Sequence, residues 1–159
     1  MTQKITTFLS FNDQAEEAVK LYTSVFKNSR VTSTQRYGDA GPGPRGAVMT
    51  MGFELAGQAF VAMNGGPTFR FAEGISLFVS CETQAEVDEL WEKLTANGGK
   101  PGRCGWLTDR FGVSWQIVPS VLTRVLGGPD PKGAARAMQA MLKMNKLDIG
   151  ALQRAYDGA

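Results

Sequence analysis

The chain has 159 residues, of which 43% are hydrophobic and 20% charged, values typical of a globular protein rather than a disordered or fibrous one. Seventeen basic and fifteen acidic residues leave a net charge of +2, and because Lys and Arg are scattered along the chain, nucleic acid is not an expected partner. No apolar run approaches the roughly eighteen residues of a membrane span, and two cysteines are too few for a disulfide framework. We therefore expect a cytoplasmic protein without membrane contact and without an export signal.

The first part of the chain predicts a strand, a helix and three further strands. The helix follows a strand at residues 5–11 and is expected to begin at Asn12 or Asp13, because small polar residues cap helix N-termini. Its apolar residues recur at intervals of three and four, which lays one face on a core as far as Lys27. The further strands are predicted at 31–37, 47–55 and 58–63, with a flexible turn at 38–46 and a hairpin around Ala56-Gly57.

The same order then starts again about 70 residues later. A strand at 74–81 precedes a helix that Glu82 or Thr83 caps and that Gly98-Gly99 ends. Two strands follow at 103–108 and 113–118, separated by the turn from Asp109 to Gly112. Shifting the chain by about 70 residues superimposes FLS on FVS and one QAE tripeptide on the other, which indicates an internal repeat.

These elements predict an α+β fold of two paired βαβββ modules, at about 1–66 and 72–119, followed by a helical extension at 120–159. Each module forms a four-stranded sheet with a helix on one face, so pairing two modules would enclose an apolar cleft between their open faces. The extension is expected to contain a short helix at 120–126 and a Met-rich helix at 132–145. Its apolar face is expected to cover the outer side of a sheet, the mouth of the cleft or a second subunit, and the sequence does not choose among them.

Three stretches resemble one known family. They are FLSFNDQAEEAVKLYTSVF, GWLTDRFGVSWQIV and AARAMQAMLKMNKLDIGALQRAY, at residues 8–26, 105–118 and 134–156. They are similar to the PhnB-like branch of the vicinal-oxygen-chelate superfamily, which includes glyoxalases, bleomycin-resistance proteins and proteins labelled 3-demethylubiquinone-9 3-methyltransferase. The resemblance implies the paired-module fold and a homodimer.

Metal-dependent members of that superfamily hold one divalent ion in the cleft through four side chains, usually His, Glu or Gln. The resemblance places those four positions near Thr6, near residues 61–63, near Ser76 and at Gln116. Only Gln116 has a plausible ligand side chain, and the sequence contains no histidine. Because transition metals require imidazole, carboxylate or thiolate ligands, we expect no metal site.

Several residues are candidates for lining the cleft. Small-molecule pockets combine apolar walls with a few polar contacts, and the residues of that kind are Gln116, Asn64, Trp106, Phe69, Phe71 and Arg110. Strand alternation lets only one of Trp115 and Gln116 face the cleft, and the family pattern favours Gln116, with Trp115 packed under a helix. Asp109 is expected to bond its own turn, and Cys81 and Cys104 are expected to pack rather than react.

The leading hypothesis is a metal-independent protein that binds an unidentified small molecule in the cleft. No cofactor is expected, since neither Gly-rich stretch has the strand, turn and helix context of an S-adenosylmethionine or dinucleotide site. The first alternative is an enzyme, a lyase, isomerase or methyltransferase, in which Gln116, Asn64, Arg110 or Tyr37 polarises a substrate without metal. The second is an interaction protein that uses its Met-rich extension.

Overall fold

The computed structural model describes residues 3–159, so Met1 and Thr2, which open the first predicted module, lie outside the described residues. The chain divides into two compact units, residues 1–71 and 72–159, and each repeats the order strand, helix, three strands. The two βαβββ modules and the C-terminal helices predicted from sequence are therefore confirmed. No helix within residues 3–159 is both long enough and apolar enough to cross a bilayer.

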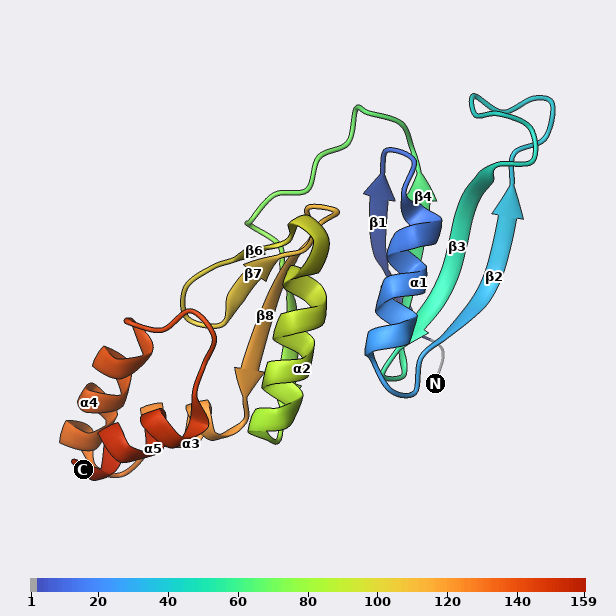
Figure 1. The fold of residues 1–159 in the computed structure, drawn as a ribbon. Helices are drawn as coiled ribbons and strands as arrows, with labels where there is room; N and C mark the ends of the chain where they lie inside the picture. Colours follow the sequence, from blue (N-terminus) through green and yellow to red (C-terminus); the bar gives the residue numbers. More distant parts are fainter. Residues whose placement is uncertain (1–2) are drawn as a thin grey trace. The chain divides into compact units, whose positions relative to one another are not determined.

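The first unit is a four-stranded sheet with one helix on it. In chain order its elements are β1 (Thr7–Phe11), α1 (Ala15–Val25), β2 (Arg30–Arg36), β3 (Val48–Leu55) and β4 (Gln58–Asn64). The sheet order is β1-β4-β3-β2, with β1 parallel to β4 and the other pairs antiparallel. Figure 1 shows α1 lying across one face of this sheet. The core between them consists of alternate strand residues and one stripe of the helix: Leu9, Phe11, Met51, Phe53, Leu55, Phe60, Ala62, Ala15, Ala18, Val19, Tyr22 and Val25.

Of two local predictions for this unit, the hairpin turn agrees with the structure and the helix cap does not. Ala56 and Gly57 both have positive φ, 49° and 85°, as a two-residue hairpin turn requires. The predicted cap of α1 is wrong, because Gln14 is the N-cap residue and its side chain makes no capping hydrogen bond. The helix also ends at Val25 rather than Lys27.

The second unit repeats the design and carries the C-terminal extension. Its elements are β5 (Leu77–Cys81), α2 (Gln84–Thr95), the short 3-10 helix η1 (Ala96–Gly98), β6 (Lys100–Pro101), β7 (Trp106–Thr108), β8 (Ser114–Pro119), α3 (Val121–Leu126), α4 (Pro131–Met141) and α5 (Ile149–Asp157). The order β5-β8-β7-β6, with β5 parallel to β8, matches the first sheet strand for strand.

The start of α2 agrees with the prediction. Thr83 is its N-cap, and the Thr83 hydroxyl accepts from the backbone N–H of Glu86. At the other end, the left-handed conformation falls on Asn97 and Gly98, with φ of 55° and 111°, rather than on Gly98 and Gly99. The two-residue strand β6 was not predicted, because it is too short to show alternation.

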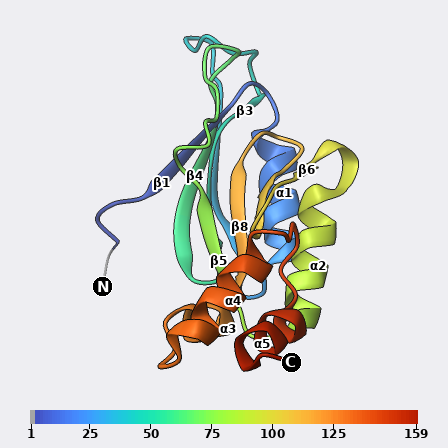
Figure 2. The same ribbon diagram turned by 90° about the vertical axis from the view of Figure 1, so that its left-hand side faces the viewer.

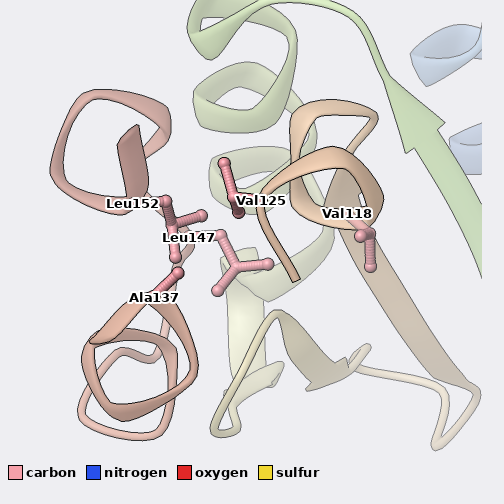
Figure 3. Close-up of a cluster of buried hydrophobic side chains, with 5 residues drawn as sticks. All are labelled: Val118, Val125, Ala137, Leu147 and Leu152. Atoms are coloured by element: carbon pink, nitrogen blue, oxygen red, sulfur yellow. The ribbon is translucent and has the colours of Figure 1, made fainter. Parts of the chain in front are cut away.

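The C-terminal extension contains three helices where the sequence predicted two, and α4 ends at Met141 rather than at residue 145. The helices gather at the end of β8 (Figure 2). Their shared core, drawn in Figure 3, contains Val118, Val125, Ala137, Leu147 and Leu152. The apolar face of α4 therefore packs inside the extension itself, with Met138 and Leu142 left exposed.

Candidate functional site

The second sheet has one covered and one open face. Trp115 and Ile117 of β8 are 2% and 0% exposed. They lie on the face of the sheet that α2 covers. The Trp115 indole Nε1 donates to Asp109 Oδ2 at 2.9 Å. Because side chains alternate along a strand, Gln116 lies on the opposite face, as predicted.

Aromatic side chains flank Gln116 on this open face. The strand register places Gln116 beside Phe78 of β5 and Trp106 of β7, and paired residues project from the same face of a sheet. Phe78 is 60% exposed and Trp106 37%. The Gln116 Nε2 donates to the Ser76 Oγ at 2.9 Å. These four residues, Ser76, Phe78, Trp106 and Gln116, are called the open patch below.

A pocket of about 500 Å³ adjoins the open patch and shares Trp106 with it. That volume lies within the range of small-molecule sites, roughly 300–1,000 Å³. Its lining residues are Glu73, Gly102, Arg103, Cys104, Trp106, Leu107, Thr108 and Ser114. Sequence reasoning found only Trp106 as a lining residue. Thr108 and Ser114 could have been found from alternation with Trp106 and Gln116, but nothing in the sequence pattern singles out Glu73 or Arg103.

The first sheet presents an equivalent but less polar open face. Phe8, which the repeat aligns with Phe78, is 52% exposed. Phe8 pairs with Val61 on β4, whereas Phe78 pairs with Gln116 on β8. Val61 is therefore the counterpart of Gln116, and Thr6, two residues before Phe8, is the counterpart of Ser76.

The four positions where the family resemblance implies metal ligands thus carry Thr6, Val61, Ser76 and Gln116. Two hydroxyls, one alkyl group and one amide provide neither a charged ligand nor an imidazole, so these residues do not fit a divalent transition-metal ion. Within residues 3–159, no three His, Cys, Asp or Glu side chains are close enough together to hold a metal ion.

Asn64 serves the fold at both ends of its amide. Its Oδ1 accepts from the backbone N–H of Ala15 at 2.8 Å, and its Nδ2 donates to the carbonyl of Val48 at 3.0 Å. The first contact supplies the N-terminal cap that Gln14 does not provide. The Tyr37 hydroxyl donates to the Asn64 carbonyl at 2.8 Å, so Asn64 joins the helix to two strands and to Tyr37, which precedes the 38–46 turn.

The other predicted cleft residues lie in different surroundings. Phe71 packs edge-on against Phe11, with ring centroids 5.1 Å apart, and Phe69 is an exposed aromatic near Gly65. The Arg110 guanidinium lies over the Phe111 ring, 4.7 Å from its centroid. Of the predicted site residues, the structure places Gln116 and Trp106 side by side.

Asp109 has the structural role that the sequence predicted. Its Oδ1 accepts from the backbone N–H groups of Phe111 and Val113, at 2.9 and 3.0 Å. The residue is 3% exposed and also bonds the indole of Trp115. The carboxylate therefore closes the β7–β8 turn on the core.

The two thiols differ in their surroundings. Cys81 is fully buried, and this burial, with smaller contributions from the Glu86 and Glu82 carboxylates, raises its pKa from 9.0 to about 12. Cys104 is half-buried in the pocket lining, and its Sγ donates to the carbonyl of Met141 at 3.6 Å. A thiol reagent should therefore distinguish them.

Comparison with known proteins identifies the family. Residues 3–118 match the family model described as 3-demethylubiquinone-9 3-methyltransferase. The PhnB protein of Bacillus cereus, whose structure carries the same methyltransferase description, is 40% identical over 74% of this chain and 100% of its own, with a TM-score of 0.69. No curated protein matches the chain.

More distant structures share the fold. Protein PA1353 of Pseudomonas aeruginosa is 23% identical over 74% of this chain and 98% of its own, with a TM-score of 0.61. The fosfomycin resistance protein FosX of Listeria monocytogenes is 15% identical over 76% and 94%, with a TM-score of 0.52.

Proposed function

The chain belongs to the 3-demethylubiquinone-9 3-methyltransferase family, and from that premise we propose that it binds a small, partly aromatic or amphipathic molecule without a metal ion. The observation that carries this proposal is the open patch beside the pocket. Phe78 and Trp106 offer apolar surface on either side of one amide, that of Gln116, which Ser76 holds by a hydrogen bond. Such a mixture of aromatic walls and few polar contacts is typical of ligand sites.

Within this proposal, Gln116 orients the ligand. Its Nε2 is used by Ser76, so its Oε1 is left on the open face as a hydrogen-bond acceptor. Trp106 and Phe78 supply stacking surface. The remaining predicted cleft residues, Asn64, Phe69, Phe71 and Arg110, are not part of the open patch, and the Asn64 amide already bonds Ala15 and Val48.

The proposal includes a homodimer. The family resemblance suggests it, and the exposed Phe8 on the first sheet is apolar surface that association would bury. Native mass spectrometry gives the stoichiometry directly.

Methyl transfer, which the family description names, is the alternative activity. The Gly41–Gly46 stretch connects antiparallel strands β2 and β3, so it does not form the turn from strand to helix that binds nucleotides in doubly wound folds. A methyltransferase reading therefore requires a different donor site. Saturable binding of S-adenosylmethionine, measured by isothermal titration calorimetry, would favour it over simple sequestration.

The test is native mass spectrometry of the protein isolated from cell extract without added metal. We expect a dimer that carries an organic adduct, whereas a stoichiometric divalent ion surviving desalting would overturn the metal-free proposal. Titration with anilinonaphthalene sulfonate, an amphipathic aromatic probe, then locates the site. Phe78→Ala and Gln116→Ala should weaken probe binding at least about fivefold.

Val31→Ala is the matched control, because Val31 is an exposed apolar residue on the edge strand β2 and lies outside the open patch. Its binding constant should equal that of the unsubstituted chain. Equal effects of all three substitutions would mean that the probe binds exposed apolar surface in general, and the proposed site would then be wrong.

A further inference from the structure

The β6–β7 turn, which lines the pocket, has an unfavourable backbone. The Trp106 N–H donates to the Arg103 carbonyl at 3.0 Å, and the two residues between them, Cys104 and Gly105, have φ of 56° and 85°. Gly suits this left-handed pair, but a residue with a Cβ, such as Cys104, does not. The turn therefore depends on contacts from outside itself.

Those contacts come from the C-terminal extension. The Cys104 N–H donates to the Met144 carbonyl at 2.9 Å and the Gly105 N–H to the Asn145 carbonyl at 2.8 Å. Gly105 is also enclosed on two sides, since a Cβ there would lie 2.8 Å from the Ile117 carbonyl oxygen and 3.0 Å from Leu147 Cδ1. Both central N–H groups of the turn are thus bound by the segment between α4 and α5.

Two side chains of α2, Gln84 and Asp88, fasten this segment to the helix. The Gln84 Nε2 donates to the Leu147 carbonyl at 3.1 Å, and the Gln84 Oε1 accepts from the Ile149 N–H at 2.8 Å. Leu147 itself is fully buried in the core of the extension (Figure 3). The Lys146 Nζ lies 2.6 Å from Asp88 Oδ1, one turn further along α2.

The extension lies beyond the region that the family model matches. The family match ends at residue 118, and the whole Bacillus cereus chain corresponds to only 74% of this one. The pocket-lining turn is thus held by a segment that lies outside the matched residues 3–118.

We propose that the C-terminal extension sets the shape of the pocket beside Trp106 by holding the Arg103–Trp106 turn, and that Gln84 is the positioning residue that fastens it. The extension contributes no residue to the pocket lining, so it acts through Cys104 and Gly105. Its effect on ligand choice rests on the proposed binding function, but its effect on the turn does not.

The first test measures the turn alone, through the reactivity of Cys104 with dithiobisnitrobenzoate. Cys81 is buried with a raised pKa, so it should stay silent in the folded protein. Gln84→Ala should make Cys104 react at least about fivefold faster, because the acceptor carbonyls of Met144 and Asn145 are no longer held in place. Thr83→Ala is the control, since it weakens the same end of α2 without touching the extension.

An unchanged Cys104 rate in Gln84→Ala, or an equal acceleration in Thr83→Ala, would overturn the proposal. If Gln84→Ala fails to fold, Lys146→Met loosens the same attachment from an exposed position and should give a smaller acceleration. A second substitution gives a rescue: Cys104→Gly removes the Cβ that disfavours the turn. Added to Gln84→Ala, it should return the tryptophan emission maximum, to which Trp106 contributes, toward that of the unsubstituted chain.

The second test adds ligand binding, with anilinonaphthalene sulfonate as the probe. Gln84→Ala should change its dissociation constant at least about threefold, and Cys104→Gly should reverse the change. If the unsubstituted chain does not bind the probe, the proposed function loses its support while the thiol rates still decide the role of the extension. If binding persists unaltered in Gln84→Ala despite faster thiol reaction, the extension does not influence ligand choice.

Discussion

The two units have the same strand order, yet they start their helices by different means. The helix α2 is capped by Thr83, the residue just before it. The helix α1 is capped by Asn64, which is 49 residues away in the chain and lies at the end of β4. One architecture therefore accepts a local cap in one copy and a tertiary cap in the other, which ties α1 to the completed sheet.

The links between the second and third strands differ in the same way. In the first unit, residues 38–46 fold around Tyr37, whose hydroxyl donates to the Asn64 carbonyl. In the second unit the link is the short Arg103–Trp106 turn, which bonds the C-terminal extension. The first copy is thus closed by its own residues, and the second by an added segment.

Fluorescence can follow the second unit separately, because all three tryptophans, Trp91, Trp106 and Trp115, lie within it. Circular dichroism reports the helices and strands of both units. Substitutions placed in one unit can therefore be scored against both signals in urea titrations.

The largest expected effect is on the β7–β8 turn. The corresponding turn of the first unit, between β3 and β4, consists of only two residues, Ala56 and Gly57. Asp109→Ala removes a buried acceptor from two backbone N–H groups and from the indole of Trp115. We expect the free energy of unfolding, followed by tryptophan emission, to fall by about 3–4 kcal/mol, because each donor left buried without a partner carries a desolvation cost. A loss below about 1 kcal/mol would mean that water replaces the carboxylate.

The next effect compares the two helix caps. Asn64→Ala should lower the free energy of unfolding by about 2 kcal/mol, since it removes both the cap of α1 and the bond to Val48. Thr83→Ala should cost about 1 kcal/mol, because it removes a cap alone. Circular dichroism in urea measures both, and equal losses would show that the tertiary cap is worth no more than the local one.

A further difference appears only at alkaline pH. Cys81 and its counterpart in the repeat, Phe11, are both buried, but only the thiol titrates. Since the folded pKa of Cys81 is raised from 9.0 to about 12, the unfolded chain loses its thiol proton first. The thiol's contribution to stability is therefore complete below pH 9 and declines as the pH rises toward 12.

The measurement is the urea midpoint of tryptophan emission at pH 8 and pH 10. It should fall less between these values in Cys81→Ala than in the unsubstituted chain, whatever the absolute stability of the variant. An equal fall of the midpoint in both proteins would show that the thiol is not shielded from solvent as the structure indicates.

The smallest expected effect concerns the ion pair that joins the extension to α2. Hydrogen bonding to Lys146, and secondly to Gln84, lowers the pKa of Asp88, but both side chains of the pair are substantially exposed. Lys146→Met should therefore change the free energy of unfolding by less than about 0.5 kcal/mol. Hydrogen exchange at Cys104 and Gly105 should be more sensitive, and unaltered protection there would argue that Gln84 suffices.

Local patterns in the sequence predicted most of the fold. Alternation placed the long strands within a few residues, and it assigned Trp115 and Gln116 to opposite faces because their neighbours are apolar and polar in turn. The repeat of the βαβββ order followed from the same signals. The helix α5 was not predicted, although Asp148 was available as its N-cap residue. The Asp148 side chain does accept a hydrogen bond from the Ala151 N–H.

The interactions that the sequence could not show join residues far apart in the chain. Gln116 meets Ser76 across 40 residues, and Gln84 meets Ile149 across 65. In the sequence, an asparagine such as Asn64 looks the same whether its side chain binds a ligand or caps a helix. Only the tertiary arrangement of the strands and helices decides which polar groups come within hydrogen-bonding distance.

The loop around Tyr37, residues 37–47, shows how a long connection can be ordered at a small cost in conformational entropy. A Cβ at Gly41 or at Gly43 would collide with the Tyr37 ring, so the backbone needs glycine at both positions to close over it. The intervening Pro42 and the following Pro44 restrict the unfolded chain. The prolines therefore reduce the conformational entropy of the unfolded loop, so the loop loses less entropy when it folds.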